Sequence, residues 1–99
     1  MGLKVLWTEP AMEQFAERLD YIGGFNPDAA RKVRRKVDDS LGRLGDFPEM
    51  GRWVPEFGPG FYREILVSPL RILYELHDAG IVITYVHRQE ENLEPDTFA

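Results

Sequence analysis

The sequence of 99 residues contains no cysteine. This excludes a disulfide framework, a thiolate metal site and a cysteine nucleophile. No apolar run approaches the ~20 residues that a membrane-spanning helix needs. The start, MGLKVLWTEP, also lacks the basic-then-apolar order of a signal peptide. We therefore expect one cytoplasmic domain over residues 1–99 with no membrane partner, and a flexible acidic tail over residues 90–99.

Positive charge is also scarce. Seventeen acidic residues stand against twelve basic ones, which gives a net charge of −5. Proteins that grip nucleic acid through its phosphates usually carry a basic face, so strong direct nucleic-acid binding is not expected. Five of the basic residues nevertheless lie together in ARKVRRKV, residues 30–37. The sequence has no phosphate-binding loop, dinucleotide-binding glycine fingerprint, nucleophile elbow or metal-ligand spacing, so neither a cofactor nor a metal is expected.

Apolar residues at helical spacing predict two helices joined by a short connection. The stripe of the first helix consists of Met12, Phe15, Ala16, Leu19 and Ile22. Thr8 is placed to cap its start, and the Gly23-Gly24 pair is predicted to end it. The second helix is predicted to begin after an Asn26 cap and to stop near Gly45.

Short runs rich in β-formers predict the strands. Their ranges are 3–7, 61–67, 70–76 and 81–87, with a short edge strand at 53–57 that Pro55 confines to an edge. The element order is β-α-α-β-β-β. We expect an α+β fold in which a helical hairpin packs on one face of a mainly antiparallel, twisted sheet.

The turn at Ser68-Pro69 fixes which way the strand side chains point. If Val67 pairs with Leu70, alternation places Arg63 on the core face opposite Tyr74. There Arg63 must find a carboxylate, stack on Tyr74 or reach past the end of the sheet. Arg71 falls on the solvent face near Glu64, as an exposed pair worth about 0–1 kcal/mol. A one-residue shift of register at the turn would exchange the faces on which Arg63 and Arg71 lie.

Several motifs run along the chain in a fixed order. They are NPDAARKV at the second helix, LGDFPEMGR at the turn after it, YREILV and RILYEL on neighbouring strands, and ITYVHR on the last strand. Together these motifs resemble the RelE/ParE superfamily of bacterial type II toxins over residues 3–89, and they look most like the ParE branch. The resemblance implies a growth-inhibiting toxin in a hetero-oligomer with an antitoxin, whose C-terminal segment wraps the toxin.

The two branches differ in mechanism. ParE-type toxins poison DNA gyrase and are not nucleases, whereas RelE-type toxins cleave mRNA on the ribosome. RelE-type toxins use helix lysines, a middle-strand arginine, and a late Arg or His followed by Tyr. Arg71 matches the middle-strand arginine, and His87 and Arg88 fall where the late residues begin. No tyrosine follows Tyr85, and residues 89–91 read Gln-Glu-Glu, which would repel phosphate, so the set is incomplete.

We therefore predict a ParE-like toxin with no catalytic residues, which binds gyrase and an antitoxin segment laid on the hairpin and a sheet edge. The alternatives are a RelE-type nuclease using Arg71, His87 and Arg88, and an inactive member that only binds its antitoxin. The basic run is either a solvated helix face or a docking stripe, and His87 is either a packing residue or a base. The candidate partner-binding residues are Arg31, Arg34, Arg35, Arg52, Arg63, Arg71, His87 and Arg88.

Overall fold

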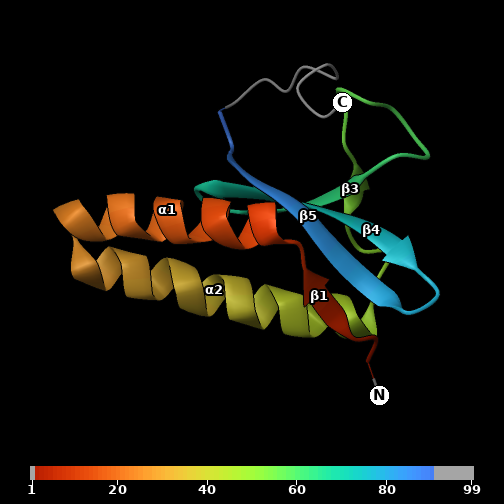
Figure 1. Ribbon diagram of the computed structural model, residues 1–99, viewed down its shortest axis with the longest axis horizontal. Helices are drawn as coiled ribbons and strands as arrows, with labels where there is room; N and C mark the ends of the chain where they lie inside the picture. Colours follow the sequence, from red (N-terminus) through yellow and green to blue (C-terminus); the bar gives the residue numbers. More distant parts are fainter. Residues whose placement is uncertain (1, 91–99) are drawn as a thin grey trace.

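The computed structural model of the protein describes residues 2–90, and the predicted tail lies outside them from residue 91 onward. Two helices lie side by side and antiparallel against a five-stranded sheet (Figure 1). The elements are β1 (Val5–Trp7), α1 (Glu9–Phe25), α2 (Pro27–Asp46), β2 (Arg52–Trp53), β3 (Arg63–Val67), β4 (Leu70–His77) and β5 (Gly80–Arg88). This confirms the α+β class and the predicted order of elements. Of the helices in the described residues, neither is both long and apolar enough to cross a membrane.

The helix caps explain where the hairpin turns. The Thr8 hydroxyl accepts from the amide of Ala11 at 3.2 Å, which begins α1 as predicted. The predicted end at Gly23-Gly24 is wrong, because α1 continues through both glycines to Phe25. Asn26 makes the turn: its amide donates to Ile22 at 2.8 Å, while its side chain accepts from Ala29 at 3.1 Å and begins α2. One residue therefore caps both helices, and the cost of two helical glycines, about 0.5–1 kcal/mol each, is tolerated.

The sheet order is β1-β5-β4-β3-β2, with β1 parallel to β5 and the other pairs antiparallel. Val67 pairs with Leu70 and Arg63 pairs with Tyr74, which confirms the predicted register. The Ser68-Pro69 peptide bond between them is cis. The predicted strand at 53–57 is wrong in extent: β2 covers Arg52–Trp53, and the chain turns after Val54, whose carbonyl accepts from the amides of residues 57 and 58.

Both faces of the sheet carry a core. Helices α1 and α2 cover one face, where Val37, Leu44, Ile72 and Ile83 are fully buried. On the other face, which we call the far face, residues 54–62 fold back over the strands. There Val54 and Leu73 are buried against Phe57, Tyr62 and Tyr85. This part of the far face is therefore covered in the described structure, although the alternation of its residues predicted a solvated surface.

Candidate functional site

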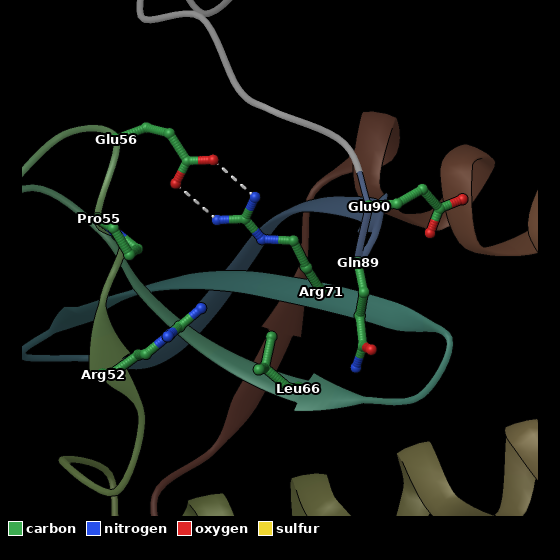
Figure 2. A pocket seen from close by; sticks show the side chains of 7 residues that line it. All are labelled: Arg52, Pro55, Glu56, Leu66, Arg71, Gln89 and Glu90. Carbon is green, nitrogen blue, oxygen red and sulfur yellow. Dashed lines mark hydrogen bonds and ion pairs between the residues drawn. The ribbon is translucent and has the colours of Figure 1, made fainter.

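An ionic cluster lies on the far face of the sheet, under residues 54–62. Arg71 donates from Nε to Glu64 at 2.7 Å and from both terminal nitrogens to Glu56 at 2.8 Å each. Arg52 donates from Nε to the other oxygen of Glu64 at 2.7 Å. Figure 2 shows the Arg71 guanidinium facing the Glu56 carboxylate, with the two bonds between them. Two arginines and two carboxylates thus form one hydrogen-bonded chain of charges.

Burial makes this cluster a structural element. The side chains of Arg71 and Glu64 are 5% and 0% exposed, so the prediction of a weak, exposed pair on a solvent face is wrong. The reason is the segment carrying Glu56, which covers the strands and supplies the second carboxylate. The bidentate bond to Glu56 raises the pKa of Arg71 above its usual value and outweighs the lowering by burial. Breaking such a buried pair from one side typically costs about 3–5 kcal/mol.

A cleft of about 590 Å³ opens beside this cluster. Its lining residues are Arg52, Pro55, Glu56, Leu66, Arg71, Gln89 and Glu90. Two of them are carboxylates, so the cleft does not present a net positive surface to a phosphate. A ligand anion would have to displace Glu56 or Glu64 from Arg71 before it could bind there.

The two late candidates on β5 lie differently from one another. His87 is opposite Arg71 in the β4–β5 register, and its ring stacks on Tyr85 at a centroid distance of 5.9 Å. Arg88 is opposite Leu70, and alternation points it to the other side of the sheet. Its Nε lies 3.4 Å from Glu90. The structure therefore brings Arg71 and His87 together and separates Arg88 from them.

A second hollow runs along the two helices and reaches β1 at one end. We call it the hairpin groove. One part, of about 300 Å³, is lined by Trp7, Met12, Phe15, Ala16, Leu19, Arg34 and Asp38. The next part, of about 350 Å³, is lined by Ala16, Leu19, Asp20, Ala30, Arg31 and Arg34. The two parts share three residues and so form a continuous groove, which has an apolar floor and arginines along α2.

Part of the apolar stripe of α1 faces this groove instead of being fully buried. Met12 is exposed, and Trp7 and Phe15 are only partly buried as they stack on each other at 5.3 Å. The predicted basic run divides here. Arg31, which pairs with Asp28, and Arg34 line the groove, whereas Arg35 is exposed outside its lining.

Arg63 takes a position that the sequence did not predict. Its guanidinium lies 4.1 Å from the centroid of the Trp53 ring rather than on Tyr74. It also donates to the carbonyls of Glu49 at 3.3 Å and Gly51 at 2.8 Å instead of to a carboxylate. Backbone carbonyls of the turn after α2 thus satisfy the half-buried charge.

Within residues 2–90, no group of three or more His, Asp or Glu side chains is close enough together to hold a metal ion.

Comparison with known proteins gives three matches. The family described as ParE toxin of type II toxin-antitoxin system, parDE, matches residues 5–93. A relative named Toxin RelE2, from Caulobacter vibrioides, is 32% identical over 79 residues, which cover 80% of this chain and 85% of the relative. A solved structure described as the chromosomal ParDE TA system from P. aeruginosa has a TM-score of 0.73 at 20% identity. It covers 89% of this chain and 97% of that one, and it shows the fold alone. The matches carry both branch names, so the choice between mechanisms depends on the chemistry of the site.

Proposed function

This chain belongs to the family of ParE toxins of type II toxin–antitoxin systems, and we propose that it inhibits growth by binding and poisoning DNA gyrase, without acting as an enzyme. The observation that carries the proposal is the state of Arg71, the residue that would serve a nuclease. Its Nε and both terminal nitrogens are already bonded to carboxylates of the same chain.

RNA cleavage through the 2′-hydroxyl needs a base, a cation to stabilise the charge that develops on the phosphate, and an acid for the leaving oxygen. Arg71 could stabilise that charge only after releasing Glu56, and Glu64 would remain behind it with no exposed surface. Net charge points the same way, because a chain at −5 gains no electrostatic attraction to ribosomal RNA. Both observations favour a protein target.

The hairpin groove is the proposed site of the antitoxin. Its apolar floor suits the apolar face of an amphipathic helix. Its edges carry Arg31 and Arg34 together with Asp20 and Asp38, so they suit charged residues of both signs, with the arginines meeting the acidic ones. The groove reaches Trp7 in β1, an edge strand of the sheet, so an extended continuation of the same segment would meet that edge. The complex would then be a toxin–antitoxin hetero-oligomer.

A ribosome-dependent nuclease is the second candidate, and two observations favour it. The relative at 32% identity is named Toxin RelE2, and Arg71 lies opposite His87 across β4 and β5. In this reading, ribosome binding would move residues 54–62 aside and free Arg71. The fold then would have to replace two partly buried charge-assisted hydrogen bonds with contacts to RNA.

One paired experiment separates the two candidates. The purified chain is added to a gyrase supercoiling and DNA-cleavage assay, and in parallel to translating ribosomes with a labelled mRNA. We expect inhibited supercoiling or accumulated cleaved DNA, together with intact mRNA. Cut mRNA with unaffected gyrase would overturn the proposal.

The control is a synthetic peptide of the antitoxin's C-terminal segment, added in excess to both assays. If it occupies the hairpin groove, its binding should change the fluorescence of Trp7, and inhibition should disappear in the same concentration range. A peptide that abolishes inhibition without affecting Trp7 would place the antitoxin elsewhere on the chain.

A further inference from the structure

The turn after α2 is built around the side chain of Tyr74. The Tyr74 hydroxyl donates to the carbonyl of Pro48 at 2.8 Å and accepts from the amide of Gly51 at 3.0 Å. A Cβ on Gly51 would lie 2.5 Å from that hydroxyl and 2.7 Å from the carbonyl of Glu64, so only glycine fits there. The Pro-x-x-Gly-Arg motif is therefore a rigid support whose position is fixed by the core.

This support holds an arginine and a tryptophan at the surface. Arg63 donates to two carbonyls of the turn, those of Glu49 and Gly51, and its guanidinium lies 4.1 Å from the Trp53 ring. Trp53 itself is 40% exposed. A large aromatic ring is thus held in place by fixed contacts while much of its surface still faces water.

A hollow of about 450 Å³ adjoins this ring, and we call it the Trp53 pocket. It is lined by Glu49, Trp53, Gly60, Phe61, Arg63, Tyr74, Glu75 and Leu76. Phe61 is 64% exposed and Leu76 is 39% exposed, although both are large and apolar. Gly58 and Gly60, at φ +76° and +97°, make the turns that bring Phe61 to the pocket. Exposed apolar side chains gathered around one hollow are typical of a binding site.

The charges at the Trp53 pocket point to the chemistry of its ligand. Glu49 and Glu75 are two carboxylates against the one guanidinium of Arg63, so the lining carries a net charge of −1. Arg63 is already bonded to backbone carbonyls, and Glu75 lies 3.5 Å from His77 at the outer end of β4. A ligand with one positive charge on an aliphatic stem would balance the lining and pack against the aromatic rings.

We propose that the Trp53 pocket binds an arginine or lysine side chain that the toxin's protein target presents beside an apolar residue. That this side chain belongs to the toxin's target is an inference that rests on the proposed function. The pocket shares no lining residue with the hairpin groove, so the antitoxin and the target would engage different surfaces. Aromatic anchors next to a charged side chain are the usual composition of an energetically important contact.

The chain carries its own reporters for a direct test, because its two tryptophans divide between the two surfaces. The full chain, labelled with ¹⁵N, is titrated with N-acetyl-leucyl-arginine amide and, separately, with the citrulline analogue, which has the same shape without the charge. We expect the arginine probe to shift the Trp53 indole signal, with Trp7 unmoved and the citrulline probe at least about fivefold weaker. An unmoved Trp53, or equal shifts with both probes, would overturn the proposal.

The second arm asks whether this recognition serves toxicity. The Glu49→Gln and Glu75→Gln changes are combined in one variant, and Glu13→Gln with Glu17→Gln on α1 gives a control of equal charge outside the pocket. We expect the first variant to lose the Trp53 shift and growth inhibition while keeping antitoxin-peptide binding at Trp7, and the control to keep all three. Unchanged growth inhibition in the pocket variant would refute the role in target binding. If the wild-type chain leaves gyrase active, the proposed function fails. The titration alone then decides whether the Trp53 pocket binds a cationic side chain.

Discussion

Arg71 lies on the far face of the sheet and Arg34 lies on the helical hairpin, and the two arginines differ in burial and in bonded partners. Arg71 is buried on the far face and bonded to two carboxylates of its own chain. Arg34 is exposed on α2 at the edge of an apolar groove. The sequence placed both among the candidate binding residues. The difference shows that residue type and spacing alone do not distinguish a buried arginine bonded within the chain from an exposed one.

The same comparison explains how this fold can separate stability from binding. The far face uses its charges to hold residues 54–62 against the strands, so its polar groups are engaged within the chain. The hairpin groove leaves apolar side chains such as Met12 in water. A partner can therefore gain free energy by covering the groove, but it must first break hydrogen bonds to enter the cluster.

The largest expected effect comes from breaking the cluster from one side. Arg71→Ala removes the buried cation of Glu64 and leaves it only the half-exposed Arg52, so we expect the free energy of unfolding to fall by about 3 kcal/mol. Urea denaturation followed by tryptophan fluorescence measures this loss. The triple variant Glu56→Gln, Glu64→Leu and Arg71→Met removes the three charges around Arg71 together and leaves the half-exposed Arg52 in contact with water, so it should be about as stable as wild type. Equal stability of wild type and Arg71→Ala would contradict the buried cluster.

A smaller effect is expected from a charge placed on the groove floor. Met12→Glu should weaken binding of the antitoxin peptide by about tenfold or more, because a carboxylate must then be desolvated under the peptide. Isothermal titration calorimetry measures the affinity. Phe25→Glu is the matched control, since Phe25 is also an exposed apolar residue of α1 and lies outside the groove lining. A similar loss in both variants would show that the peptide is not in the groove.

The smallest effect is expected at the groove edge. Arg34→Ala should weaken the same binding by about two- to fivefold, and added salt should diminish the difference, because an exposed ion pair contributes little and is screened. Arg35→Ala, one residue along and outside the lining, should leave the affinity unchanged. If the two variants behave alike, the basic run acts only through its overall charge.

Much of the fold follows from local rules that the sequence states directly. The period of two on each side of the Ser68-Pro69 turn was enough to pair Arg63 with Tyr74, and Asn26 was recognisable as a cap. The helix ends were less accurate, because packing and hydrogen bonds carried α1 through two glycines. Alternation and capping are short-range effects, and they were predicted well wherever no distant segment intervened.

The path of residues 54–62 could not be predicted from alternation or capping. The wrong prediction that Arg71 and Glu64 form an exposed pair follows from this. Neither alternation nor composition shows that Glu56 reaches back to Arg71, or that Gly51 must lack a Cβ beside Tyr74. These contacts join parts of the chain that are distant in sequence, and they decide which arginine is engaged. The sequence placed the antitoxin segment on the helical hairpin without showing the groove itself, because periodicity cannot tell a buried position of a stripe from an exposed one.

The most direct test of the central claim uses the triple variant of Glu56, Glu64 and Arg71, which leaves only the half-exposed Arg52 charged at the cluster. Its inhibition of gyrase supercoiling and its effect on mRNA in translating ribosomes are compared with wild type at equal folded concentration. The account predicts that gyrase inhibition is retained, with intact mRNA in both samples. Loss of toxicity in a folded triple variant, together with mRNA cleavage by the wild-type chain, would show that Arg71 is catalytic and would contradict the account.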